Sequence, residues 1–313
     1  MEIKKIAVIG AGMMGNTIAQ VFASNPKLTV TLGTISTEDD PLAPIKRNID
    51  LMITHGAATE SMKEDILSRI RFETDLKTAT ENADFIIECV FEIMDLKQNL
   101  FEEIEKYCRP DAILATNTSV MSVTEIASKC KLKNRVVGAH FWNPGHLMPL
   151  VEVVQTEQSS QEAIEATMQL LVDCGKKPIL CKKDVPGFVA NRLQHALWRE
   201  AFYMVQEGIA DPKTIDDACK YGPGLRWPVL GPMENSDMVG IQLSYNIQNY
   251  ILKFLADNHE PSHCLTDMLE KGELGFASGK GWQSWTPEEA NASKAELQKY
   301  LIKSQLKNEN NTK

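Results

Sequence analysis

The sequence lacks several features, each of which would point to a particular class of protein. No apolar run reaches the roughly 18 residues that a membrane-spanning helix needs. No block of lysine or arginine is present, and 33 basic residues against 42 acidic ones give a formal net charge of −9. The short apolar runs therefore predict that the chain has no membrane span. Because an acidic surface repels phosphate backbones, we also expect no nucleic-acid binding through a broad basic face.

Paired cysteines are also missing. The seven cysteines are odd in number, scattered and nowhere spaced as C-x-x-C, which argues against a disulfide framework and against a zinc site. The chain enters a strand pattern almost at once, so we expect no signal peptide. These absences together predict a cytoplasmic protein with reduced thiols and no bound metal.

What is present suffices for two domains. The 313 residues exceed what one hydrophobic core usually organises, and 43% hydrophobic with 24% charged residues is an ordinary globular composition. In the first part, short β-branched runs alternate with helical patterns, which predicts a mostly parallel sheet with helices on both faces. The expected strands are 6–9, 28–32, 85–87, 112–115, 136–140, 150–154 and 178–181.

Two changes of pattern divide the chain further. Residues 41–69 are helical in pattern with Gly56 near the middle, and predict a helical hairpin inserted into the α/β domain and projecting from the sheet. After Pro186-Gly187, strand patterns stop and helical patterns dominate. The predicted division is an α/β domain, an all-α domain and a frayed tail: residues 1–186, 187–307 and 308–313. The helices expected in the all-α domain include 188–207, 213–220, 236–256 and 266–270.

A glycine-rich loop directly follows the first expected strand and opens a helix. Gly10 permits the tight turn, Gly12 lets the backbone approach a pyrophosphate, and Gly15 lets the helix pack close to the strand. Backbone N–H groups at the helix start, around Met13 and Met14, and the positive end of the helix dipole then hold the phosphates. The pattern predicts a Rossmann-type, dinucleotide-binding domain.

One position departs from the usual NAD-binding pattern. Where an Asp or Glu normally ends the second strand and binds the adenosine ribose, this chain has Gly33. Losing the carboxylate removes repulsion of a 2′-phosphate, but no arginine follows at once, and the nearest basic residues are Lys46 and Arg47. NADP therefore stays an alternative to NAD, with Asp39 or Asp40 as substitute ribose partners under the NAD hypothesis.

Several polar residues stand at strand ends or interrupt apolar runs. Ser119, with Asn117 before it, follows a strand at the carboxyl edge, where ligands bind in open α/β sheets. His140 ends another strand, and Glu152 interrupts an apolar run, where a carboxylate is costly to bury without a partner. A histidine that gains a proton during turnover is a suitable partner, because the carboxylate orients and stabilises its imidazolium. Asn191 is expected on the first turns of the second domain, in position to face the same cleft.

Each of these residues has a structural alternative. His140 can be a hydrogen-bonded structural histidine, and Glu152 can lie on a solvent-facing strand edge. Asn117 and Ser119 can cap the next helix, and Asn191 can cap a helix or bond between the domains. Their order along the chain is what favours a shared site.

Taken in order, these elements resemble the L-3-hydroxyacyl-CoA dehydrogenase family over nearly the whole chain. The matching blocks are 10–15, 88–97, 117–119, 140–144, 150–153, 186–188 with 191–192, 231–234 with 237 and 240, and 275, 279 and 281–282. The resemblance implies a Rossmann-type domain joined to a helical domain that commonly forms a homodimer. It also implies an NAD-dependent oxidoreductase of fatty acid metabolism that moves a hydride between NAD and C3 of an L-3-hydroxyacyl-CoA.

The resemblance also assigns roles to residues. It makes His140 the general base, Glu152 the residue that orients it, and Ser119 and Asn191 the donors to substrate oxygens. Hydride transfer leaves a proton that needs a base near pH 7, which supports the same assignment of His140. The positions that match cofactor contacts are Gly10, Gly12, Met13, Met14, Gly15, Glu92, Lys97, Asn117, Ser119 and Asn143.

Three departures leave the substrate open. Family members that act on acyl-CoA often carry a lysine at position 149. This chain has Pro149 there, and in this it resembles relatives that act on free carnitine or gulonate. The Arg226-Trp227 pair resembles the carnitine-type branch of the family. Arg226 would then clamp a carboxylate and Trp227 would contact a quaternary ammonium. The alternative is that Arg226 caps a helix and Trp227 packs at a dimer interface. The 41–69 hairpin, which should help hold coenzyme A, mixes basic and acidic residues and neither supports nor excludes the thioester.

The sequence thus predicts a 3-hydroxybutyryl-CoA-like dehydrogenase that acts on an acyl-CoA. One alternative is a dehydrogenase of a small 3-hydroxy acid without coenzyme A. The other is a catalytically silent NAD(H)-binding protein, like the lens crystallin relative of the family. Retention of His140, Glu152, Ser119 and Asn191 argues against the silent protein.

Overall fold

The structure, a computed structural model, describes residues 2–34 and 40–311, with side chains as far as Leu306. The described chain forms two compact units. One comprises the chain up to Arg192 together with the segment from Glu296 on, and the other comprises Leu193–Ala295. The C-terminal segment is therefore grouped with the first unit, whereas the sequence analysis placed it in the second domain.

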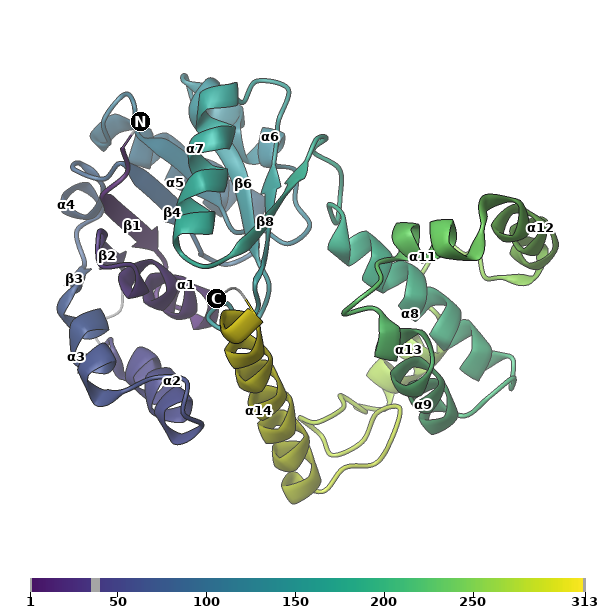
Figure 1. The fold of residues 1–313 in the computed structure, drawn as a ribbon. Coiled ribbons are helices and arrows are strands. Elements are labelled where there is room, and N and C mark those ends of the chain that lie inside the picture. The colour runs from purple at the N-terminus through teal and green to yellow at the C-terminus, as the bar shows by residue number, and fades with distance from the viewer. Residues whose placement is uncertain (1, 35–39, 312–313) are drawn as a thin grey trace. The chain divides into compact units, whose positions relative to one another are not determined.

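An eight-stranded sheet forms the centre of the first unit (Figure 1). The strand order is β3-β2-β1-β4-β5-β6-β7-β8, and all neighbours are parallel except the antiparallel pair β6 and β7. The strands are β1 (Lys5–Ile9), β2 (Thr29–Gly33), β3 (Ile70–Glu73), β4 (Phe85–Glu88), β5 (Ile113–Thr116), β6 (Val136–Phe141), β7 (Leu150–Val154) and β8 (Lys177–Cys181). The predicted fold class is confirmed, and β3 is an edge strand that the sequence analysis missed.

Successive strand residues build a separate core on each face of the sheet. In β1, Ile6 and Val8 belong to one buried cluster, and Ala7 and Ile9 belong to the other. Helices α1, α2, α3 and α7 contribute to the first cluster, and α4, α5 and α6 to the second. These helices are α1 (Met13–Ser24), α2 (Ala43–Thr54), α3 (Glu60–Ser68), α4 (Leu76–Thr80), α5 (Met94–Tyr107), α6 (Val123–Ile126) and α7 (Gln161–Asp173), with short 3-10 turns at Ala127–Lys129 and Lys133–Arg135.

The helical insertion is a hairpin of α2 and α3. The Thr59 hydroxyl caps α3 by accepting a hydrogen bond from Met62 N at 3.2 Å. Ile45, Ile49 and Ile66 are buried in the same cluster as the apolar side chains of α1. The prediction of a helical hairpin in the α/β domain is confirmed, and its two helices pack against α1.

The second unit is helical, as expected. Its helices are the C-terminal part of α8 (Ala190–Gln206), α9 (Pro212–Tyr221), α10 (Pro223–Arg226), α11 (Pro232–Val239), α12 (Ile241–Ile251), a 3-10 turn at Leu252–Phe254, α13 (His263–Glu270) and the start of α14 (Pro287–Asn311). The single helix predicted over 236–256 is wrong, because Gly240 adopts φ 100° and separates α11 from α12. Within 193–295, the buried apolar side chains are Ile215 and Ala290, which are 7% and 5% exposed.

The C-terminal helix α14 extends further than predicted. Residues 308–313 were expected to be a frayed tail, yet α14 continues to Asn311. Ile302 on this helix is fully buried within the first unit. Among the described helices, none is both long and apolar enough to cross a membrane.

Candidate active site

His140 and Glu152 lie opposite each other on β6 and β7. The antiparallel register places them side by side, and His140 Nδ1 is 2.8 Å from Glu152 Oε2. His140 is 5% exposed and Glu152 is fully buried. Because the carboxylate accepts the proton of Nδ1, Nε2 of His140 is the nitrogen left to exchange a proton with a ligand.

Glu152 is held by four donors. Its Oε2 also accepts a hydrogen bond from Trp142 Nε1 at 3.1 Å. Its Oε1 accepts hydrogen bonds from Val189 N and Ala190 N, both at 2.9 Å, where α8 begins. Burial alone would raise the pKa of Glu152, but these hydrogen bonds, with that from His140, outweigh burial and lower the pKa to about 2. The carboxylate is therefore ionised at neutral pH and can stabilise an imidazolium.

Ser119 and Asn191 are brought together as well. Asn191 Nδ2 donates to Ser119 O at 3.0 Å, while within the described chain the Ser119 hydroxyl and the Asn191 amide oxygen make no hydrogen bond. Asn117 occupies a different place, because its Oδ1 accepts a hydrogen bond from Phe141 N at 2.8 Å and ties the end of β5 to β6. Asn117 therefore links β5 to β6 at the carboxyl edge of the sheet, two residues before Ser119.

A partly buried network of charged side chains holds the backbone of Ser119. Glu92 Oε1 accepts hydrogen bonds from Ser119 N at 3.1 Å and from the Thr118 hydroxyl. Lys97 is 1% exposed, and its Nζ lies 2.7 Å from Glu88 Oε1 and 3.1 Å from Glu92 Oε2. The structure thus encloses the Lys97 ammonium between two carboxylates, so that it faces the site through Glu92 and not directly.

The glycine-rich loop has the geometry of a phosphate-binding turn. Gly10 has φ 110°, and a Cβ there would lie 2.7 Å from Cys89 O; a Cβ at Gly15 would lie 1.7 Å from Gly10 O. A Cβ at Gly12 would meet no atom within 4 Å, so open space lies beside it. Helix α1 starts at Met13 without a side-chain cap, which leaves its first N–H groups available to an anion. This loop fits a dinucleotide pyrophosphate.

The residues expected near the adenosine and nicotinamide ends are placed as follows. Gly33 ends β2, and its carbonyl accepts a hydrogen bond from Gly10 N at 2.8 Å. Asp40 forms an ion pair with Lys46 at 2.8 Å, which lowers the pKa of Asp40, and Asp39 lies outside the described residues. Asn143 is exposed on the loop between β6 and β7.

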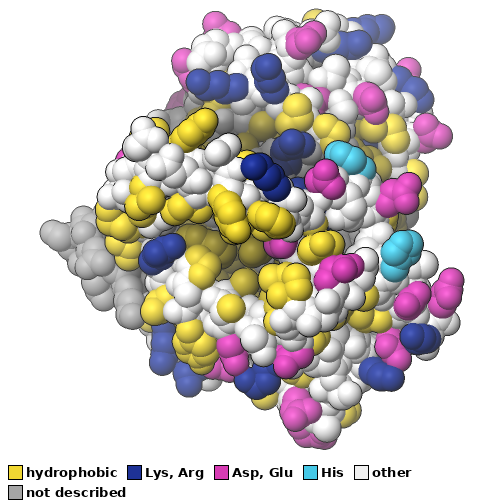
Figure 2. Space-filling model, turned by 90° about the vertical axis from the view of Figure 1, so that its right-hand side faces the viewer, with side chains coloured by type: hydrophobic (Ala, Val, Ile, Leu, Met, Phe, Trp, Pro, Cys, Tyr) yellow, Lys and Arg dark blue, Asp and Glu magenta, His cyan; other side chains and the backbone are white. Residues whose placement is uncertain are grey.

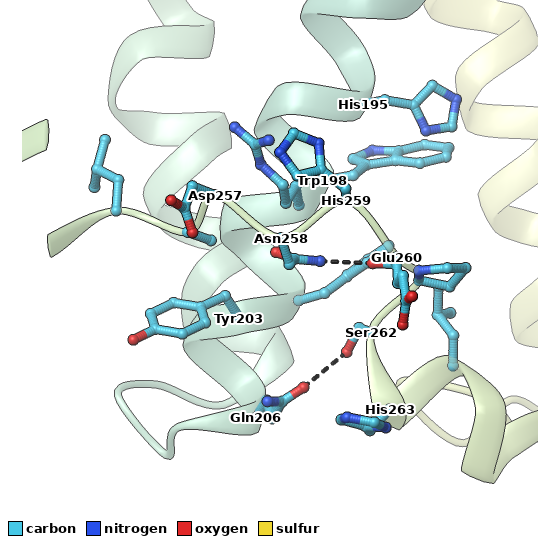
Figure 3. A pocket seen from close by; sticks show the side chains of 16 residues that line it. His195, Trp198, Tyr203, Gln206, Asp257, Asn258, His259, Glu260, Ser262 and His263 are labelled. Atoms are coloured by element: carbon cyan, nitrogen blue, oxygen red, sulfur yellow. Dashed lines mark hydrogen bonds between the residues drawn. The ribbon is translucent and has the colours of Figure 1, made fainter. Parts of the chain in front are cut away.

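Arg226 and Trp227 belong to the second unit. Both are exposed in the second unit, and neither side chain forms a hydrogen bond or ion pair within the described chain. The second unit also has a hollow of about 770 Å³ between α8 and the segment 255–265. Figure 3 shows His195, His259 and His263 around it, with Ser262 bonded to Gln206. None of the predicted site residues lines this hollow.

Two residues of the site were not predicted. Glu88, fully buried at the end of β4, partners Lys97, and Trp142 donates to Glu152. A carboxylate that ends an apolar strand is a signal that identifies Glu88. Among the described residues, no group of three or more His, Cys, Asp or Glu is placed to hold a metal ion.

Comparison with known families covers nearly the whole chain. Residues 5–185 match the domain described as 3-hydroxyacyl-CoA dehydrogenase, NAD binding domain. Residues 187–285 match the domain described as 3-hydroxyacyl-CoA dehydrogenase, C-terminal domain.

Two kinds of relative are among the similar proteins. A probable 3-hydroxybutyryl-CoA dehydrogenase of Bacillus subtilis is 35% identical over 288 residues, which cover 91% of this chain and 98% of the relative. A 5-formyl-3-hydroxy-2-methylpyridine 4-carboxylate 5-dehydrogenase of Mesorhizobium japonicum is 29% identical over 304 residues, or 96% of each chain.

Solved structures show the same two kinds. An NAD+ dependent dismutase, the 5-dehydrogenase of the same pyridine carboxylic acid, has a TM-score of 0.85 at 29% identity and covers 97% of each chain. An (S)-3-hydroxybutyryl-CoA dehydrogenase from Ralstonia eutropha has a TM-score of 0.76 at 32% identity and covers 91% of this chain and all of its own.

Proposed function

The chain belongs to the 3-hydroxyacyl-CoA dehydrogenase family, and we propose that it transfers a hydride between NAD and C3 of an L-3-hydroxyacyl-CoA such as 3-hydroxybutyryl-CoA. The observation that carries the proposal is the buried pair of His140, near the carboxyl end of β6, and Glu152 on β7 of the same mostly parallel sheet. The glycine-rich loop, which fits a dinucleotide, follows β1 of the same sheet. When bound, NAD supplies the hydride acceptor.

The side chains divide the proton chemistry among them. His140 Nε2 removes the proton of the substrate hydroxyl as the alcohol becomes a ketone, and returns it in the reverse direction. Glu152, ionised and fixed by four donors, stabilises the imidazolium that forms. The free hydroxyl of Ser119 and the side-chain amide of Asn191 are the groups that hydrogen-bond the substrate oxygen.

For the cofactor, we propose NAD held by the loop from Gly10 to Gly15 and by Asn143. Lys97 serves indirectly, because it holds Glu92, and Glu92 holds the Ser119 backbone. NADP is the alternative, since Gly33 provides no carboxylate to repel a 2′-phosphate. Asp40 is a weak substitute for that carboxylate, because it is already paired with Lys46.

A second substrate class is favoured by the hairpin of α2 and α3. Most of the cations that would attract the phosphates of coenzyme A there are already engaged. Lys46 pairs with Asp40, and Lys63 pairs with Asp50. Arg69 donates to a backbone carbonyl of α1 at 2.9 Å. The relative that spans this chain almost end to end is named for a pyridine carboxylate. A small hydroxy or aldehyde acid without coenzyme A is therefore the second candidate, with Arg226 and Trp227 as candidate contacts.

We also propose that the protein is a cytoplasmic homodimer assembled through the second unit. A helical unit of this size normally buries a substantial apolar core, yet within 193–295 Ile215 and Ala290 are the only buried apolar residues. Many large apolar side chains of this unit are exposed, among them Leu243, Tyr245 and Ile247 on α12. Figure 2 shows one face of the molecule, on which hydrophobic side chains are numerous. A second copy of the chain would cover such a surface. Light scattering with size-exclusion chromatography tests this, and a monomer at micromolar concentration would contradict it.

Turnover by the purified protein tests the substrate. Acetoacetyl-CoA, dehydrocarnitine and 5-formyl-3-hydroxy-2-methylpyridine 4-carboxylate should each be supplied with NADH and with NADPH, and the pyridine aldehyde also with NAD. The proposal expects turnover of acetoacetyl-CoA with NADH. Turnover only of the free acids would replace the thioester by the second candidate. Normal NADH binding without turnover of any substrate would favour a silent, crystallin-like protein.

A further inference from the structure

Two side chains hold four consecutive carbonyls of the loop between β6 and β7. Lys176 Nζ donates to Gly145 O at 2.6 Å and to Met148 O at 2.9 Å. Gln305 Nε2, from α14, donates to His146 O at 3.1 Å and to Leu147 O at 2.8 Å. The loop therefore has its outer carbonyls fixed by one residue and its inner carbonyls by another.

Lys176 is buried at an energetic cost, and Gln305 depends on the position of α14. Lys176 is 9% exposed and has no carboxylate partner among the described residues, although burying an unpaired ammonium is unfavourable. Burial lowers the pKa of Lys176 to about 8. Gln305 depends on the docking of α14, which Ile302, one turn earlier and fully buried, secures.

The loop follows β6, the strand that carries the proposed general base, and packs against α1, the helix that follows the glycine-rich loop. It begins directly after β6, which carries His140, and contains the exposed Asn143. Gly145 packs so closely on α1 that an added Cβ would lie 2.6 Å from Thr17 Oγ1 and 3.7 Å from Met14 Cε. Any shift of the loop would therefore change the position of Asn143 relative to the helix that follows the glycine-rich loop.

We propose that Lys176 and Gln305 are positioning residues that press this loop onto α1, and that the C-terminal helix α14 thereby acts as a strap that sets Asn143 for cofactor binding. The proposal rests on the function proposed above. Helix α14 begins at Pro287, after the second family match ends at residue 285, so the strap lies outside the two matched domains. The C-terminal segment of this chain is in this way part of the nicotinamide-cofactor site without touching the cofactor.

The test uses the full chain with Gln305→Leu, which keeps the bulk of the side chain and removes the donor. Ser304→Ala is the matched control, because Ser304 bonds only to Tyr300 O of its own helix. We expect the Kd for NADH to rise about tenfold in Gln305→Leu, in line with the loss of two hydrogen bonds. The kcat at saturating NADH should stay within twofold of the wild type, and Ser304→Ala should bind NADH normally.

Hydrogen exchange separates the strap from the proposed function. The amides of residues 145–148 should exchange faster in Gln305→Leu than in Ser304→Ala, whether or not cofactor is bound. Unchanged exchange would overturn the strap itself. Faster exchange with unchanged NADH affinity would overturn its role in cofactor binding. Failure of the wild-type protein to bind NADH or NADPH would instead remove the proposed function, and with it the cofactor role of the strap.

Discussion

Glu152 and His140 form a buried pair whose two members come from neighbouring antiparallel strands, with Oε2 of the first 2.8 Å from Nδ1 of the second. The other carboxylate oxygen accepts the first N–H groups of α8. One side chain therefore sets the tautomer of the histidine and also satisfies the start of a helix.

Replacing His140 by alanine removes the proposed general base. We expect kcat to fall by at least about 10²-fold, the usual scale for losing such a group. Steady-state kinetics on the substrate identified by the assay measures this, and NADH titration serves as the control for an intact cofactor site. A variant with near-normal kcat and normal NADH binding would show that His140 is structural.

Glu152→Gln should remove a pH-dependent part of the stability. The pKa of Glu152 is about 2 in the folded protein, below the ordinary value of 4.5, so folding favours the ionised form. This contribution is fully present above pH 4.5 and is lost as the pH falls towards 2. The difference corresponds to about 3 kcal/mol of unfolding free energy. Denaturant unfolding across this pH range should show a steeper acid loss for the wild type than for the variant, and equal slopes would argue against a strongly lowered pKa.

Gly12→Ala should affect cofactor binding, whereas Gly15→Ala should affect stability. At Gly12 the new methyl group meets no protein atom within 4 Å, so thermal stability should be unchanged while the methyl group obstructs the pyrophosphate. We expect the Kd for NADH to rise at least about tenfold, which costs about 1.4 kcal/mol of binding. At Gly15 the methyl group would meet Gly10 O at 1.7 Å, so the melting temperature should fall. Tight NADH binding by a stable Gly12→Ala variant would place the phosphates elsewhere.

Lys97→Met tests whether this lysine supports the fold around the site. Removing the ammonium leaves the buried Glu88 without its cation, and breaking a buried pair in this way costs about 3–5 kcal/mol. Lys106→Met is the comparison, since Lys106 pairs with Glu103 on the surface and its loss should leave the denaturation midpoint nearly unchanged. If both variants unfold at the same denaturant concentration as the wild type, the network does not stabilise the fold.

The features that the sequence predicted well depend on local pattern. Seven strands were predictable because each is a short apolar run between helical segments, and the Gly10 to Gly15 spacing has a specific conformational requirement. Strand β3 was missed because its four residues mix apolar and charged side chains at the sheet edge. The break at Gly240 was missed because the apolar pattern continues across it, and only the backbone conformation ends α11.

The site was predictable in part for a similar reason. A carboxylate among valines demands a partner, and His140 was the expected one; the register of β6 and β7 pairs these two residues. The enclosure of Lys97 by Glu88 and Glu92 was not predictable, since it depends on how the start of α5 turns back over the end of β4. The hold of Gln305 on the loop after β6 joins residues about 160 positions apart, and no local pattern carries that information.

The four hydrogen bonds of Glu152 carry a consequence for divergence among homologues. His140, Trp142 and the amides of Val189 and Ala190 share one carboxylate, so replacing it would leave donors from three segments unpaired at once. We therefore expect a single substitution of Glu152 to destabilise the protein. Homologues that lack the glutamate should also differ at the histidine and at the start of α8. Covariation of these positions in an alignment of homologues would record that shared dependence.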